Sequence, residues 1–179
     1  MKNFSKARRS LGIAGLILAA LALLGLRNVD WFLLKKSLRH KFANIEWIST
    51  GDLADWLANK DRPAPVLLDV RTPEEWDVSH LPGARRIEPG TSADKAAAGL
   101  PKETPIVTYC AVGYRSGDMA ERFRAAGFTN VRNLEGSIFQ WANEHRPLVR
   151  ENTSVSRVHP YNSFWGHLLE DDVRAPLKK

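Results

Sequence analysis

The hydrophobic positions divide the chain into an N-terminal apolar stretch and a longer region with a mixed pattern. From Ser10 to Leu26 no residue is charged, and nearly all are leucine, alanine, isoleucine or glycine. From about residue 43 to 150, short apolar runs alternate with segments of helical periodicity. This alternation is typical of an α/β domain with a central, mostly parallel sheet flanked by helices. Roughly a hundred residues suffice for one hydrophobic core.

Several helices of the α/β region carry their own start and stop signals. Ser49 is a candidate N-cap for a helix that ends near Asn59. Thr72, Pro73 and Glu75 make a capping box, with proline at the first helical position and glutamate three residues after the cap. Strands are expected at 66–69, 106–109 and 131–134, and further helices at 93–100, 117–126 and 137–145.

The N-terminal apolar stretch predicts a membrane segment. Residues 1–9 form a basic head, and residues 10–27 are expected to be a transmembrane helix, because seventeen helical residues reach roughly 25 Å. A secretory signal is the alternative, with a secreted or periplasmic domain after cleavage. The only small-x-small triplet, Ala20-Leu21-Ala22, lies inside the apolar run, which favours an uncleaved single-pass anchor. Basic residues flank the segment on both sides, so its orientation stays open.

Residues 28–42 predict a basic amphipathic helix next to the membrane. Trp31, Leu34, Leu38 and Phe42 recur at helical spacing, and lysine and arginine largely fill the other face. Such a helix can lie in the headgroup layer of a lipid bilayer. An ordinary solvated linker helix is the alternative.

Charge is concentrated at the N-terminus and argues against a nucleic-acid partner. The chain has 26 lysines and arginines against 20 acidic residues, a net charge of +6. Residues 1–42 hold nine basic side chains and one acidic, so the rest of the chain is nearly neutral. A nucleic-acid surface needs basic residues clustered on the folded domain, and the sequence beyond residue 42 offers no such excess.

Reactive chemistry is predicted at Cys110, the single cysteine of the chain. It follows the apolar run 106–109 and precedes a short loop with Gly113 and Arg115 that opens a helix. Backbone N–H groups, the helix dipole and a guanidinium all favour a thiolate over a thiol. A lone cysteine is more often a small buried hydrophobe, but the loop favours a reactive sulfur.

Four motifs in fixed order resemble the single-domain rhodanese family of sulfurtransferases. They cover about residues 43–150 and imply the rhodanese-like α/β fold. The family often carries a second glycine at the position of Ser137, and we expect this departure to alter a turn rather than the chemistry. The motifs are Leu67-Leu68-Asp69-Val70-Arg71-Thr72-Pro73-Glu74-Glu75-Trp76, His80-Leu81-Pro82-Gly83-Ala84, Tyr109 to Ser116, and Asn133-Leu134-Glu135-Gly136 with Trp141 and Pro147-Leu148.

The resemblance implies transfer of sulfane sulfur through Cys110. A donor such as thiosulfate leaves its outer sulfur on the cysteine as a persulfide, and a thiol or cyanide acceptor removes it. Backbone N–H groups of the loop can form a nest for the anionic sulfur, and Arg115 can hold a sulfonate-like group or steady the loop. Asp69 and Arg71 lie at a strand end where they could orient the substrate, although structural pairing or capping is favoured for both. The expected substrate-binding residues are Ala111, Val112, Gly113, Tyr114, Arg115, Ser116 and Arg71.

No cofactor or metal is expected, because the chain has one cysteine and its histidines lack ligand spacing. His80 is not assigned as a general base. Two other functions remain open. One is a weakly active or non-catalytic rhodanese-fold module that carries or senses sulfur, or binds a partner, at the membrane. The other is a phosphatase or arsenate reductase, which is disfavoured because phosphatase loops place arginine six positions after cysteine, whereas Arg115 follows Cys110 by five.

Residues 151–179 leave the family pattern. The stretch 158–169 is rich in aromatic residues, too rich for a purely solvated tail. Three alternatives follow: the tail packs back on the domain, contacts the membrane surface, or holds a protein partner.

Overall fold

The computed structural model describes residues 27–177 of the chain. The chain divides into two compact units, residues 1–34 and 35–179. Within the first unit the described residues, 27–34, are helical, and helical structure runs on through residue 41 in the second. Apart from its last residue, the predicted membrane segment at 10–27 lies outside the described residues. Within residues 27–177, no helix is both long enough and apolar enough to cross a bilayer.

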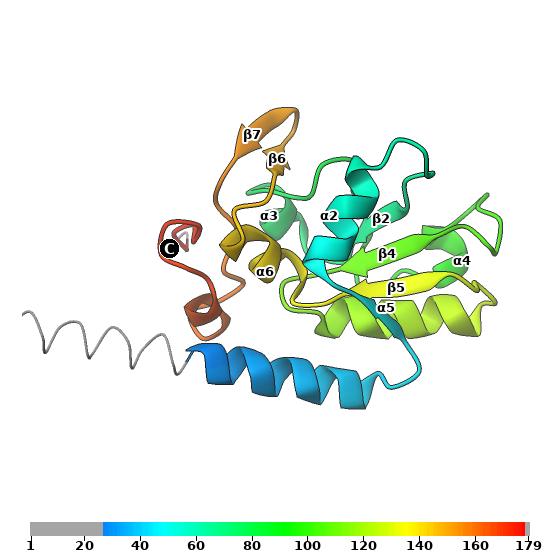
Figure 1. Ribbon diagram of the computed structural model, residues 1–179, viewed down its shortest axis with the longest axis horizontal. Helices are drawn as coiled ribbons and strands as arrows, with labels where there is room; N and C mark the ends of the chain where they lie inside the picture. Colours follow the sequence, from blue (N-terminus) through cyan, green and yellow to red (C-terminus); the bar gives the residue numbers. More distant parts are fainter. Residues whose placement is uncertain (1–26, 178–179) are drawn as a thin grey trace, which may run out of the picture. The chain divides into compact units, whose positions relative to one another are not determined.

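A five-stranded parallel sheet forms the centre of the second unit (Figure 1). The strands lie in the order β1-β5-β4-β2-β3, and each neighbouring pair is parallel. All four residues of the central strand β4 are buried, as expected where helices cover both faces of a sheet. The predicted α/β fold is therefore confirmed. The strands are β1 (Glu46–Ile48), β2 (Val66–Asp69), β3 (Arg85–Arg86), β4 (Ile106–Tyr109) and β5 (Val131–Leu134).

Helices flank this sheet: in Figure 1, α5 lies below it, α2 lies above it, and α6 lies next to α2 at the left. The Ser49 side chain caps α2 by accepting a hydrogen bond from the Asp52 N–H. Both bonds of the predicted capping box between Thr72 and Glu75 are present at the start of α3. The helices are α2 (Thr50–Ala58), α3 (Pro73–Trp76), α4 (Ala93–Ala96), α5 (Tyr114–Ala125) and α6 (Ser137–Asn143).

The boundaries differ from the sequence prediction where local patterns are short. The helix predicted at 93–100 ends at Ala96, and the one predicted from residue 117 begins at Tyr114. The earlier start follows from Gly113, whose φ of 112° is a left-handed conformation that favours glycine and turns the chain directly from the loop into α5. The edge strands β1 and β3 were not predicted, because three and two residues are too short to show alternation.

Within the second unit, the end of the N-terminal helical segment packs on the domain. Leu38 and Phe42 are 5% and 1% exposed, and Arg39 Nε donates to Glu135 Oε1 at 2.8 Å. The Phe42 ring lies against Gly117 of α5. The prediction that Leu38 and Phe42 face lipid headgroups is therefore wrong, because the domain itself buries both side chains.

The tail also packs on the domain, the first of the three alternatives for residues 151–179. After a hairpin of β6 (Leu148–Arg150) and β7 (Thr153–Val155), the chain returns to α6, where the Asn143 side chain binds the Leu168 carbonyl and the Glu170 N–H. A short 3-10 helix, η1 (Trp165–Leu168), follows the hairpin. Four apolar residues of the tail are almost completely buried, namely Val158, Leu168, Leu169 and Val173.

Gly117→Ala is expected to destabilise the domain by about 1–3 kcal/mol through overpacking, although alanine favours helix over glycine by about 1 kcal/mol. A Cβ added at Gly117 would lie 2.6 Å from two carbons of the buried Phe42 ring. Urea unfolding followed by circular dichroism measures the change. Gly90→Ala is the matched control, because a Cβ there meets nothing within 4 Å. Equal stability of the two variants would contradict the packing of Phe42 on α5.

Candidate active site

The Cys110 loop lies at the carboxyl end of β4, in the middle of the sheet. In parallel α/β sheets, ligand sites form at this end of the strands. The start of α6 holds the loop backbone: the Ile138 N–H donates to the Cys110 carbonyl at 3.2 Å, and the Phe139 N–H donates to the Ala111 carbonyl at 3.1 Å. The buried Asn133 amide donates to the Gly113 carbonyl at 2.8 Å. The loop is therefore fixed by hydrogen bonds from its neighbours in the fold.

Ser137 supports the loop in a way that the sequence did not reveal. Its hydroxyl accepts a hydrogen bond from the Cys110 N–H at 3.2 Å and donates to the Leu134 carbonyl at 3.2 Å. Its φ is 50°, in the left-handed region that favours glycine. The serine keeps the turn that a glycine would make and adds a hydroxyl that satisfies the buried N–H of Cys110. Its effect thus extends beyond the turn to the backbone of the reactive residue.

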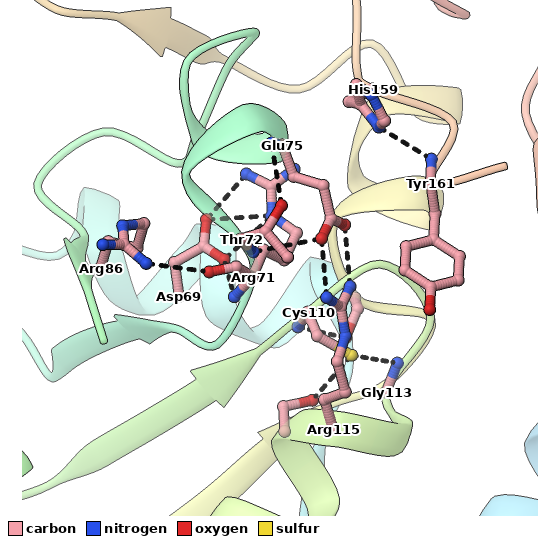
Figure 2. A network of polar contacts seen from close by, with 12 residues as sticks. Asp69, Arg71, Thr72, Glu75, Arg86, Cys110, Gly113, Arg115, His159 and Tyr161 are labelled. Atoms are coloured by element: carbon pink, nitrogen blue, oxygen red, sulfur yellow. Dashed lines mark hydrogen bonds and ion pairs between the residues drawn. The ribbon is translucent and has the colours of Figure 1, made fainter. Parts of the chain in front are cut away.

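The Cys110 sulfur receives hydrogen bonds from its own loop (Figure 2). The Gly113 N–H donates to Sγ at 3.2 Å, and the Ser116 hydroxyl lies 3.5 Å from it. Burial raises the pKa of the Cys110 thiol, but the charge of Arg115, the Ser116 hydroxyl and the backbone N–H groups of Ser116 and Gly113 oppose this effect. The net result is a pKa below the ordinary value for cysteine. The loop therefore favours the thiolate, which is the nucleophilic form.

Arg115 is paired with a residue that the sequence analysis placed elsewhere. Its Nη1 and Nη2 donate to the two carboxylate oxygens of Glu75 at 2.6 and 2.8 Å (Figure 2). Burial raises the pKa of Glu75, but Arg115 outweighs it and the net pKa is lowered. The role of Glu75 in the capping box explained its presence in the sequence, so nothing there indicated this second contact. The terminal nitrogens expected to hold a sulfonate group are thus already bonded to a carboxylate.

Arg71 does not line the site, contrary to the substrate-binding role expected for it. Its side chain is fully buried, forms a bidentate ion pair with Asp69 and donates to the Ser79 carbonyl at 2.6 Å. Burial lowers the pKa of Arg71, but Asp69 outweighs this and keeps the guanidinium charged. The geometry corresponds to the alternative of structural pairing, because a buried charge needs a partner of opposite sign.

A cavity of about 290 Å³ opens above the sulfur. Of the predicted residues, Gly113 and Ser116 bind the sulfur rather than line the cavity. Tyr161 and Trp165 come from the tail, and sequence reasoning missed them as site residues. The only signal was the aromatic content of 158–169, which does not say what the rings contact. The cavity is lined by Cys110, Ala111, Val112, Tyr114, Arg115, Tyr161 and Trp165.

A larger cavity, of about 790 Å³, lies among Trp76, His80 and His159 and does not include Cys110. His80 stacks on Trp76 with ring centroids 3.5 Å apart, and its backbone pairs with that of Val149. These contacts give His80 a structural role. Among the described residues, no cluster of three or more histidine, cysteine or acidic side chains is arranged to hold a metal ion.

The chain is similar to known proteins over this region. Residues 49–144 match the family model described as a rhodanese-like domain. A protein named sulfurtransferase from Allochromatium vinosum is 32% identical over 105 residues, which cover 59% of this chain and 95% of the relative. The probable adenylyltransferase/sulfurtransferase MoeZ of Mycobacterium tuberculosis is 36% identical over 101 residues. Those residues cover 56% of this chain but only a quarter (25%) of MoeZ.

Solved structures share the fold. The crystal structure of a rhodanese-related protein from Thermoplasma volcanium superposes with a TM-score of 0.52 at 27% identity, covering 59% of this chain and 99% of that one. The BH2092 protein of Bacillus halodurans gives a TM-score of 0.53 at 26% identity, covering 64% of this chain and 84% of that one. With the family model matching more than half of its residues, the chain belongs to the rhodanese-like domain family.

Proposed function

We propose that the protein is a sulfurtransferase that moves sulfane sulfur from a donor to a thiol or cyanide acceptor through a persulfide on Cys110. The observation that carries this proposal is the hydrogen bonding of the Cys110 sulfur by the Gly113 N–H at the floor of an open cavity, beside the Arg115 guanidinium. A scaffold protein needs none of these features. The names of two relatives, each including the word sulfurtransferase, also support it.

The reaction follows from the chemistry of a thiolate. The Cys110 thiolate attacks the outer sulfur of the donor, so that a new S–S bond forms on the cysteine and the donor's own sulfur bond breaks. With thiosulfate as the simplest donor, sulfite leaves. An acceptor thiolate or cyanide then attacks the outer sulfur and regenerates the Cys110 thiolate. The loop N–H groups stabilise the anionic persulfide as they stabilise the thiolate. Because the chain has a single cysteine, the acceptor comes from outside it.

The same proposal includes attachment to a membrane through residues 10–27. It rests on the uncharged stretch from Ser10 to Leu26, whose length as a helix approaches the thickness of a hydrocarbon core. Basic residues flank this uncharged stretch on both sides. The domain would then act on donors and acceptors next to a bilayer.

Cys110→Ser tests the covalent step. The full chain in detergent is treated with thiosulfate, mercaptopyruvate or polysulfide and analysed by intact mass. We expect the wild-type protein to gain the mass of one sulfur atom, and Cys110→Ser to gain none, because serine forms no persulfide. Loss of the added mass after treatment with cyanide identifies it as sulfane sulfur. A wild-type mass that no donor changes would sink the sulfurtransferase proposal in favour of a binding module.

The pH dependence of thiol alkylation tests the role of Arg115. Iodoacetamide reacts with the thiolate, so we expect half-maximal reactivity of Cys110 at a lower pH than for free cysteine, because its pKa is lowered. The double variant Arg115→Met/Glu75→Gln removes both charges and is expected to move the midpoint to higher pH. Glu75→Gln alone is the control, because it keeps the positive charge and the midpoint stays low. An unchanged midpoint in the double variant contradicts the role given to Arg115.

Carbonate extraction tests the anchor. We expect the full chain to stay in the membrane pellet at alkaline pH, because an apolar helix across the bilayer is not released by charge repulsion. Replacing Leu16 and Leu18 by lysine is expected to shift most of the protein to the supernatant. Release of the wild-type chain, or a shortened N-terminus found by mass, would exclude an uncleaved anchor.

A further inference from the structure

The cavity above Cys110 is walled mostly by apolar and aromatic side chains. Arg115 is the one charged residue among the described residues that line it. Both terminal nitrogens of Arg115 bind the Glu75 carboxylate, whose side chain is only 2% exposed. This bidentate pair uses one N–H of each terminal nitrogen and offsets part of the guanidinium charge, while Arg115 still helps to lower the pKa of Cys110. A doubly charged inorganic anion entering the cavity therefore meets a single cation, which a carboxylate already neutralises in part.

The tail adds aromatic surface to this mostly apolar cavity. The Arg115 guanidinium carbon lies 4.9 Å from the centroid of the Tyr161 ring, so the ring occupies a second side of the guanidinium. Trp165 provides another aromatic wall, and Tyr114 and Val112 supply apolar surface from the loop. Figure 2 shows the Tyr161 ring next to the Glu75–Arg115 pair. The polar end of Arg115 is thus shared between a carboxylate and a ring.

The fold holds these rings in place. Tyr161 has a φ of 63°, a left-handed conformation that is uncommon for a tyrosine and costs of the order of 1 kcal/mol. Its N–H donates to Nδ1 of His159 at 3.0 Å, and the Trp165 N–H donates to the Asn162 side chain at 2.9 Å. Gly166 follows, with its N–H bonded to the Asn162 carbonyl. An unfavourable conformation kept by several hydrogen bonds at the edge of a reactive site points to a functional requirement.

We propose that the tail makes the Cys110 cavity selective for organic persulfides with a small apolar group, such as a benzyl or short alkyl group, over inorganic thiosulfate, with Tyr161 and Trp165 as specificity-determining residues. This inference rests on the proposed sulfurtransferase function. A volume of about 290 Å³ lies at the small end of ligand cavities, which limits the organic group to roughly one ring. Tyr114 and Tyr161 are 51% and 45% exposed, so both reach the mouth where such a group enters.

The chemistry balances without an oxidant or reductant. The Cys110 thiolate attacks the terminal sulfur of the donor R–S–SH. A bond forms between that sulfur and Sγ, and the donor's S–S bond breaks. The leaving group R–S⁻ takes up the proton and departs as the thiol, while Cys110 keeps the sulfur as a persulfide anion. An apolar R group gains from contact with the aromatic walls, whereas the loss of hydration is most costly for thiosulfate, which carries two charges.

Paired donors test the inference on the full chain in detergent. The rate at which Cys110 gains one sulfur is measured by intact mass with benzyl persulfide and with thiosulfate. The preference is the rate with benzyl persulfide divided by the rate with thiosulfate. We expect this ratio to be at least about tenfold higher for the wild-type protein than for free cysteine. In Tyr161→Ala and Trp165→Ala this preference is expected to fall by about tenfold. Leu177→Ala removes an exposed side chain of the same tail outside the cavity and serves as the control.

Glu75→Gln gives an independent measurement in a nearly isosteric variant. This variant leaves Arg115 without its carboxylate partner. We therefore expect the preference for benzyl persulfide over thiosulfate to fall, because loading of Cys110 by thiosulfate becomes faster. Using the ratio of donors cancels any change in thiolate content. A wild-type ratio equal to that of free cysteine, or ratios unchanged in all three variants, would overturn the selectivity while leaving the sulfurtransferase proposal intact. Failure of both donors to load Cys110 would overturn both proposals.

Discussion

The ion pair between Glu75 and Arg115 is the interaction on which the site depends. It joins α3, which follows β2, to α5, which follows β4, across the mouth of the Cys110 loop. The capping box with Thr72 holds Glu75 in place at the start of α3. The same residues that start this helix therefore also position the carboxylate that binds Arg115. A carboxylate this well buried needs an opposite charge nearby. Arg115, in turn, keeps enough influence on Cys110 to help lower the pKa of the thiol.

Segments outside the family pattern complete the site from two sides of the second unit. Before the family match, Leu38 lies where a Cβ at Gly113 would point, 3.4 Å from its Cδ1. After the match, the tail supplies Tyr161 and Trp165 to the cavity. The loop thus meets additional packing behind its glycine and additional aromatic surface above its sulfur. The family fold fixes the position of the cysteine, and the added segments decide what surrounds it.

The sequence predicted those features that depend on local signals. Apolar runs located β2, β4 and β5, and the residues Ser49 and Thr72 marked helix starts, because strand burial and capping are read from neighbours in the chain. Three features escaped it because they depend on distant contacts. These are the partner of Arg115, the hydroxyl that Ser137 offers to Cys110, and the rings that the tail brings back to the loop. Arg71 was expected near the substrate from its place at a strand end, but the side chain turned into the core toward Asp69.

The near-complete burial of Cys110 has a consequence for the persulfide that the proposed function requires. Cys110 is only 1% exposed, and the chain offers no second thiol to displace the bound atom. Tyr114, Tyr161 and Trp165 line the cavity above the sulfur and narrow the access of bulky reductants to it. Under the proposed function, the lifetime of a persulfide on Cys110 would therefore depend on the shape of the incoming nucleophile as well as on its concentration.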